Sequence, residues 1–196
     1  MNEPAARRAD VRVGSSTDAL TPLAGARRSL GARGQQWLGL LAIALAALAG
    51  DQLTKNIVSS HLALDAERHV AGPLSIHHVQ NSGIAFGLFA SATPIVTVLT
   101  AVAVVWMLFF FARSGARHPV LPIALGLLIG GSASNLTDRI RLGHVTDFID
   151  LRFWPAFNLA DSFIVLGVLV LLVALLLPQS SQTRPRPVPD VPHPGP

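Results

Sequence analysis

Long apolar runs separated by polar segments dominate the chain between residues 37 and 177. A helix needs about 20 residues to cross about 30 Å of hydrocarbon, and four of the runs are close to that length. The pattern therefore predicts an all-α integral membrane protein with four transmembrane helices. We expect these helices at about 37–58, 94–112, 120–137 and 157–177.

The first run is the shortest, because only residues 38–49 are uninterrupted before "GDQLTKN". An alternative interpretation makes it a signal peptide, with "RRSLG" as a twin-arginine start and "ALAG" as a small-residue cleavage site. Asp51 and Lys55 favour a crossing instead, because their i, i+4 spacing places them on one helix face where they can pair inside a bundle.

The segments between the runs indicate where polar structure lies. Residues 59–93 are too polar to span a membrane, and β-formers at 76–79 precede the turn residues Asn81, Gly83 and Gly87. We therefore expect a small β-rich extracytoplasmic segment between helices one and two, and a second outer loop at 138–156. The third run also holds small residues that permit close helix contact. These are Gly126, Gly130, Gly131, Ser132, Ala133 and Ser134.

Orientation follows from the basic residues, because cytoplasmic loops carry the excess of Lys and Arg. With both termini inside, the inner side holds Arg7, Arg8, Arg12, Arg27, Arg28, Arg33, Arg113, Arg117, Arg184 and Arg186. The outer side holds Lys55, Arg68, Arg139, Arg141 and Arg152. This asymmetry favours a multi-pass protein with cytoplasmic termini.

Composition agrees with a membrane class. The 196 residues are 51% hydrophobic and 13% charged, which is too apolar for an ordinary soluble domain. Residues 1–36 form an Arg-rich tail that we expect to be disordered and to touch anionic lipid at most, and 178–196 form a Pro-rich tail. The first tail has no aromatic residue before Trp37, so we expect no nucleic-acid binding.

Several kinds of catalytic site are excluded or disfavoured. The chain has no Cys, no H-E-x-x-H and no G-x-S-x-G. His77 and His78 are adjacent and would point to opposite faces of a strand, so we expect no metal and no cofactor. Lys55 is a poor base, because Asp51 one turn away would keep it protonated.

Carboxylates remain as candidate chemistry. Asp161 is unusual, because it begins an apolar run in which an ionisable group is costly and marks a candidate site. Asp138 and Asp147 lie in the preceding segment, and antiparallel helices bring these positions to the same outer face. Two carboxylates that meet share one proton, so one acts as a base and the other as an acid.

The cations beside each of the other aspartates indicate which one pairs with Asp161. Asp138 is followed by Arg139 and has Arg141 close by, which suits a salt bridge, and Asp150 likewise has Arg152 nearby. Asp147 has no adjacent cation and can keep a proton. We therefore predict that Asp147 and Asp161 form a catalytic dyad that activates water against a peptide bond.

Alternatives exist for each polar residue. Asp161 and Asn158 could cap a helix, Asn135 could be a packing hydrogen bond, and Asn81 with Gly83 could be turn chemistry. For the whole chain, the rivals are a proton- or cation-coupled transporter and a non-catalytic membrane adaptor. Transporters keep ionisable groups near the midplane and often show internal repeats, and neither feature is found here.

Four blocks of the sequence resemble lipoprotein signal peptidase, the signal peptidase II family of membrane aspartic peptidases. The blocks are "DQLTK" at 51–55, "NSGIAFGLF" at 81–89, "GGSASNLTDRIRLGHVTDFIDL" at 130–151 and "FNLADSFI" at 157–164. The resemblance implies a bacterial inner-membrane enzyme with its active site near the extracytoplasmic face. It also implies cleavage of prolipoproteins before a Cys that carries a diacylglyceryl group.

The resemblance assigns residues as well. It implies that Asp147 and Asp161 form the dyad. Asn81, Asn135, Arg139 and Asn158 match positions that line or support the site, and we place Gly83 with them. Asp51 and Lys55 match a structural block, and we count Asp138 with it. We expect a monomer whose partners are the lipidated substrate and membrane lipids, with residues 59–93, including Phe86 and Phe89, clamping the substrate by strand addition.

Two departures from the family pattern stand out. Ser134 replaces the Gly that usually precedes the Asn of the third block, and the stretch from Asp147 to Asp161 is shorter than in many members. The two tails lie outside the resemblance.

Overall fold

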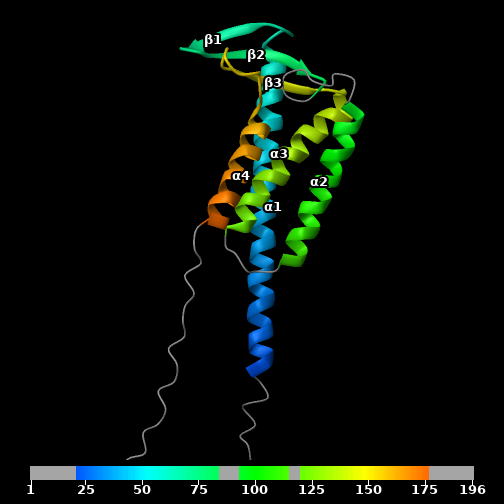
Figure 1. Ribbon diagram of the computed structural model, residues 1–196, viewed down its shortest axis with the longest axis vertical. Helices are drawn as coiled ribbons and strands as arrows, with labels where there is room; N and C mark the ends of the chain where they lie inside the picture. The colour runs from blue at the N-terminus through cyan, green and yellow to red at the C-terminus, as the bar shows by residue number, and fades with distance from the viewer. Residues whose placement is uncertain (1–20, 84–92, 115–119, 177–196) are drawn as a thin grey trace, which may run out of the picture.

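Four helices and three strands make up the described part of the chain, residues 21–83, 93–114 and 120–176 of a computed structural model. In chain order they are α1 (Thr21–His61), β1 (Glu67–Ala71), β2 (Leu74–Asn81), α2 (Thr93–Ser114), α3 (Leu121–Leu142), β3 (Val145–Asp150) and α4 (Leu159–Leu176). The sheet covers one end of the helix bundle, and the start of α1 and the end of α4 lie toward the opposite end (Figure 1).

Three helices are long and apolar enough to cross a membrane. They are Arg33–His61, Thr93–Arg113 and Leu159–Leu176, and they coincide with three of the four predicted crossings. The segment predicted as the third crossing is helical, as α3, but it is not among these three. α3 carries more polar and charged residues and contacts each of the other three helices. Protein therefore surrounds much of its surface.

Two helices extend beyond their predicted ends. α1 begins at Thr21, so residues 21–36, which we expected to be disordered, are helical. Leu, Ala and Arg, which are frequent there, are among the strongest helix formers. α3 continues past residue 137 to Leu142 and ends at Gly143, whose left-handed φ of 78° lets its N–H donate to the carbonyl of Arg139.

Small residues bring the helices close together, as the sequence predicted. A Cβ atom on Gly130 would lie 2.5 Å from the carbonyl oxygen of Ala44 in α1, and one on Gly131 would lie 2.5 Å from that of Ala160 in α4. α3 is thus held tightly between α1 and α4. A buried apolar cluster also joins α3 to α1 and α2. Its residues are Leu40, Ala44, Phe111, Leu125 and Ile129.

The sheet is antiparallel with the order β1-β2-β3. The sequence predicted β-structure at 59–93 and described 138–156 only as an outer loop. The strand β3, which lies in that second segment and completes the sheet, was not predicted. Val145 and Phe148 are buried β-formers, and the register with β2 places Val79 opposite Asp147 and Asn81 opposite Val145. This pairing brings the two polar residues Asn81 and Asp147 together.

Some predictions fall on residues outside the described ranges. They are the first twenty residues, Gly87, the clamp residues Phe86 and Phe89, Arg117, and the Pro-rich segment 178–196.

Candidate active site

Asp147 lies in β3 and is 2% exposed. Its Oδ2 accepts a hydrogen bond from Nδ2 of Asn81 at 3.0 Å, and its Oδ1 accepts one from Nδ2 of Asn158 at 2.7 Å. Burial raises the pKa of Asp147 to about 6 and the charge of Asp161 raises it too, whereas the two amides and the charge of Lys55 lower it. This carboxyl group can therefore hold a proton near neutral pH.

Asp161 lies in the first turn of α4, where Asn158 caps the helix. The N–H of Asp161 donates to Oδ1 of Asn158 at 2.9 Å, and the N–H of Asn158 donates to Oδ2 of Asp161 at 3.4 Å. This is a reciprocal capping box, so the capping alternative describes the local geometry correctly. The other oxygen, Oδ1, accepts a hydrogen bond from Nδ2 of Asn135 at 2.8 Å, so the same carboxylate also faces α3.

One buried residue, Asn158, contacts both Asp147 and Asp161, which we call the aspartate pair. Asn158 is fully buried, and its Nδ2 donates to Asp147 and also to Oδ1 of Asn135 at 3.1 Å. Its Oδ1 accepts the N–H of Asp161. The preceding residue, Phe157, pairs through its backbone with Ile149 in β3, with N···O distances of 2.8 and 3.0 Å. This pairing holds Asn158 in place. Residues from β3 and α4 thereby meet through one side chain.

A second group of charges lies beside the pair, and we call it the lysine cluster (Asp51, Lys55 and Asp138). Nζ of Lys55 lies 2.7 Å from Oδ2 of Asp51 and 2.8 Å from Oδ2 of Asp138, and all three side chains are buried. It also donates to Oδ1 of Asn135 at 2.8 Å. The predicted pairing of Asp51 with Lys55 is confirmed, and α1 is continuous through both residues, as the crossing interpretation requires.

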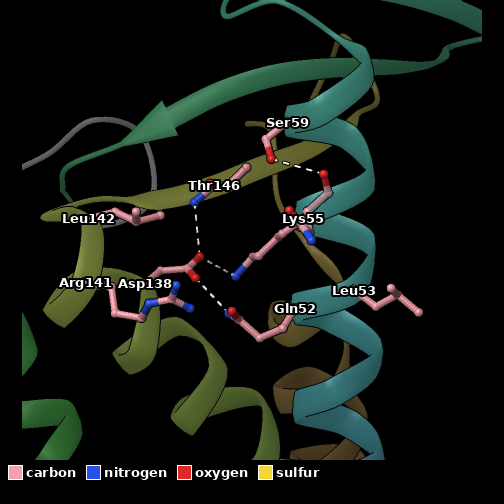
Figure 2. Close-up of a pocket in the computed structure, with 9 residues that line it drawn as sticks. Gln52, Leu53, Lys55, Ser59, Asp138, Arg141, Leu142 and Thr146 are labelled. Carbon is pink, nitrogen blue, oxygen red and sulfur yellow. Dashed lines mark hydrogen bonds and ion pairs between the residues drawn. The ribbon is translucent and has the colours of Figure 1, made fainter.

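The cation that neutralises Asp138 differs from the one expected. The sequence suggested a salt bridge to Arg139 or Arg141, but the structure pairs Asp138 with Lys55 of α1 (Figure 2). Helix packing explains the difference, because α1 lies directly against the face of α3 that carries Asp138. The half-buried Arg139 instead donates to the carbonyl of Asn135 at 3.5 Å, and its charge interacts with those of both members of the aspartate pair.

Sequence reasoning missed two members of this polar network. Nε2 of Gln52 donates to Oδ1 of Asp138 at 2.7 Å and to Oγ of Ser134 at 3.0 Å. Ser134 donates to Oδ2 of Asp51 at 2.7 Å, so the residue that departs from the family pattern adds a hydrogen bond to the lysine cluster. The spacing of Gln52 three residues before Lys55 is a signal that could have placed it on the same helix face.

The remaining predicted residues also lie at the site. The N–H of Gly83 donates to Oδ1 of Asn81 at 3.0 Å, so these residues form the turn that the alternative interpretation proposed. The other end of the Asn81 amide, Nδ2, donates to Asp147. Asp51 reaches α4, because its Oδ1 accepts the N–H of Ala160 at 2.9 Å. Every predicted site residue therefore lies in one connected region.

Two pockets flank this region. An apolar pocket of about 490 Å³ contains Asp161 as the one charged residue in its lining. The rest of that lining is Leu151, Phe153, Trp154, Phe157, Ser162, Val165, Leu166 and Leu169. A polar pocket of about 450 Å³ opens beside the lysine cluster between α1, α3 and β3 (Figure 2). Neither was predicted, although the aromatic residues at 153–157 are a signal for the first.

His77 and His78, the adjacent histidines of β2, make local contacts at the sheet. Nδ1 of His77 lies 3.1 Å from Oδ2 of Asp150, and Nδ1 of His78 lies 2.9 Å from the carbonyl of Leu62. Within the described residues, no group of three or more His, Asp or Glu side chains is arranged to hold a metal ion.

The fold and the site together define an integral membrane protein with a pair of carboxylates, one buried and one partly buried, at one end of its helix bundle. Two bacterial membrane enzymes of known structure are similar, with TM-scores of 0.66 and 0.63 and sequence identities of 28% and 30%. The first similarity covers 79% of this chain and 94% of that enzyme, and the second covers 73% and 93%.

Sequence comparison identifies the family. The family model for signal peptidase II matches residues 43–177. Lipoprotein signal peptidase from Moorella thermoacetica is 40% identical over 145 residues, which cover 74% of this chain and 97% of that protein. The enzyme of the same name from Symbiobacterium thermophilum is 36% identical over 149 residues, covering 73% and 97%. The chain belongs to the signal peptidase II family and is a membrane peptidase.

Proposed function

We propose that this protein is an aspartic endopeptidase that removes the signal peptide from prolipoproteins by hydrolysis before a diacylglyceryl-modified Cys. The observation that carries the proposal is the aspartate pair. Both carboxylates are bound by Asn158, and within the described residues their hydrogen-bond donors are amide N–H groups rather than cations. An amide orients a carboxylate without fixing its charge, so either member is free to exchange a proton.

The chemistry requires one protonated and one ionised carboxyl group. The ionised group takes a proton from water, the water oxygen attacks the scissile carbonyl carbon, and the protonated group donates to the carbonyl oxygen. The tetrahedral intermediate then collapses as its C–N bond breaks and the nitrogen takes a proton. The products are a signal peptide with a new carboxylate and a lipoprotein with a free amino group on Cys. The raised pKa of Asp147 supports its role as the group that carries the proton.

The apolar pocket suggests how the substrate approaches. It lies beside Asp161 and is lined by aromatic and aliphatic side chains of α4 and of the segment after β3. An apolar part of a membrane-bound substrate fits this lining, while its scissile bond remains near the polar site. Residues 59–93 would hold the polypeptide in an extended form.

The domain and its topology form part of the proposal. Residues 37–177 are the peptidase domain, α3 is a fourth crossing surrounded by the other helices, and both termini are cytoplasmic. Support comes from the basic residues at the end opposite the sheet, where Arg33 donates to the carbonyl of Ala112 and Arg113 lies over the ring of Phe109. The site then lies at the extracytoplasmic face of the inner membrane of a bacterium. We propose a monomer in contact with membrane lipids.

Cleavage of a lipidated precursor tests the function. The full chain in liposomes should release the signal peptide, whereas Asp147→Asn and Asp161→Asn should each lose at least about 10²-fold in rate. Asp150→Asn is the matched control, because Asp150 lies on the same strand but pairs with His77. Normal turnover by either of the first two variants would refute the dyad. A transporter or an adaptor would release no peptide from any variant.

A further inference from the structure

We propose that Lys55 is a positioning residue for the aspartate pair. Its ammonium group fixes the orientation of the Asn135 amide and so directs the N–H of that amide at Asp161. This role rests on the proposed function and extends it, because Lys55 belongs to a block that the sequence indicated to be structural.

The ammonium group determines which end of the amide it meets. It has three N–H donors and no acceptor, and it lies within 2.8 Å of one oxygen each of Asp51, Asp138 and Asn135. The Asn135 atom that faces it must therefore be the oxygen. The amide nitrogen then points to the opposite side, where it donates to Oδ1 of Asp161 at 2.8 Å.

The same polarity continues to the second aspartate. Because Oδ1 of Asn135 accepts from both Lys55 and Asn158, the Asn158 atom that faces it must be the nitrogen. That nitrogen also donates to Asp147, and the Asn158 oxygen is left to accept the N–H of Asp161. A flipped Asn135 would point its oxygen at a carboxylate. One cation thus sets the direction of the hydrogen bonds that reach both carboxylates.

A purely structural lysine would need only its two carboxylates. The third hydrogen bond, to Asn135, leads out of the lysine cluster and into the site. The charge of Lys55 also lowers the pKa of Asp147, which shows that the two groups interact electrostatically. The charged groups around the aspartate pair are Asp51 and Lys55 from α1 and Asp138 and Arg139 from α3.

The polar pocket makes the role testable by chemical rescue. It is lined by Lys55 together with Asn56, Ser59 and Arg141, and Figure 2 shows Lys55 reaching from α1 toward Asp138 at its edge. Replacing Lys55 with Ala would join the emptied space to the pocket. A small protonated amine from solution could then enter and donate to Asn135 in place of the lysine.

The experiment measures cleavage of a lipidated precursor by the full-length Lys55→Ala protein in liposomes. We expect kcat to fall at least about tenfold, with a smaller change in KM, because the proposed role of the lysine is to orient the Asn135 amide rather than to bind substrate. Methylammonium and ethylammonium should restore kcat saturably. Tetramethylammonium carries the same charge but no N–H donor and should not. Arg141→Gln, which changes the lining of the same pocket, should leave kcat within about twofold of wild type.

The pH profile separates positioning from folding. Without the lysine charge the pKa of Asp147 rises, and Asp147 is the group that carries the proton in the proposed reaction. The alkaline limb of kcat/KM should therefore move to higher pH, and methylammonium should move it back. Loss of folded protein alone would lower the amount of enzyme without moving the limb. A folded Lys55→Ala protein with an unchanged limb and no response to methylammonium would overturn the proposal, as would wild-type kcat in that variant.

A charge-matched pair of variants covers the case in which Lys55→Ala does not fold. Lys55→Gln with Asp138→Asn keeps the net charge of the lysine cluster, and Asp138→Asn alone keeps the lysine. The double variant should have a lower kcat than the single one, because Gln can present either end of its amide to Asn135. Its alkaline limb should lie at higher pH, because the lysine charge is absent. Equal profiles would overturn the positioning role. The peptidase proposal would still stand if wild type cleaves and Asp147→Asn and Asp161→Asn do not.

Discussion

The lysine cluster and the aspartate pair each hold two carboxylates at the sheet end of the same bundle, yet the donors that bind the carboxylates differ. Lys55 stands between Asp51 and Asp138, at 2.7 and 2.8 Å. The aspartate pair is bound by amide N–H groups instead: the Asn158 side chain donates to Asp147, and the Asn158 backbone and the Asn135 side chain donate to Asp161. A cation between two carboxylates compensates their charge, whereas a neutral amide orients a carboxylate and leaves its protonation open. The first arrangement suits structure and the second suits proton transfer.

The two groups also join different parts of the fold. The lysine cluster connects α1 to α3 and, through the Ala160 N–H, to α4. The aspartate pair connects β3 to α4, and Asn135 of α3 contacts both groups. The lysine cluster thus holds together the helices against which the aspartate pair is positioned.

The largest expected effect comes from removing the central cation. Lys55→Met would leave the two buried carboxylates of Asp51 and Asp138 without a cation. Breaking a buried ion pair costs about 3–5 kcal/mol of unfolding free energy. Thermal unfolding in detergent measures the loss. Adding Asp138→Asn to Lys55→Met should recover part of it, because one of the two uncompensated charges is removed. If the single and double variants unfold at the same temperature, the charges are not what holds this cluster.

A smaller effect should follow the titration of Asp147. Its pKa is raised from 3.8 to about 6 in the folded protein, so the protonated form stabilises the fold. That contribution is fully present below pH 3.8 and is lost as pH rises through about 6. Asp147→Asn does not titrate. Its stability relative to wild type should therefore rise by up to about 3 kcal/mol across this window, at 1.36 kcal/mol per pKa unit.

Unfolding of both proteins as a function of pH tests this prediction. Any constant cost of placing an amide between the Asn81 and Asn158 donors cancels, because only the change with pH is compared. Parallel curves for variant and wild type would mean that Asp147 titrates normally in the folded state.

The contrast between the two groups was only partly visible in the sequence. The i, i+4 spacing gave the pairing of Asp51 with Lys55, and the lack of a cation next to Asp147 distinguished it from Asp138 and Asp150. The first inference is confirmed, because it depends only on local helix spacing. The choice of Asp147 stays a prediction. The expectation for Asp138 failed because its cation comes from another helix.

Other features depend on tertiary contacts that local patterns do not contain. β3 is six residues long and is a strand because β2 pairs beside it, with a register shift between Ile76 and Val79. The contacts of Gln52 and Ser134 depend on how α1 meets α3. Apolar runs predicted the helices well but not their ends, because α1 and α3 continue into polar residues that the run length does not count.

An intermediate effect is expected where α3 meets α4. A Cβ on Gly131 would lie 2.5 Å from the carbonyl oxygen of Ala160, the residue before Asp161. Gly131→Ala should therefore push α4 away, cost about 1–3 kcal/mol and lower kcat, because it shifts one aspartate relative to the other. Thermal unfolding and cleavage assays in parallel measure both effects.

Gly50→Ala is the matched control for that substitution. Gly50 is also helical, but a Cβ there would meet nothing within 4 Å. This variant should be as stable as wild type or more stable by up to about 1 kcal/mol, with unchanged kcat. Equal losses in the two variants would show that helix backbone effects, rather than the α3–α4 contact, are responsible.

The smallest effect is expected at Asp150, which belongs neither to the lysine cluster nor to the aspartate pair. It lies on β3 with Asp147, but the backbone N–H of Arg152 and then the His77 ring lower its pKa. A depressed pKa contributes stability that is present above the unfolded value and is lost as pH falls through the folded value. The pair with His77 is partly exposed, so Asp150→Asn should cost less than about 1 kcal/mol at neutral pH and nothing in acid. Cleavage of the lipidated precursor should remain within about twofold of wild type, because the side chain contacts the sheet rather than Asn158. A loss of activity as large as that of Asp147→Asn would mean that Asp150, which pairs with His77, carries the proton rather than Asp147.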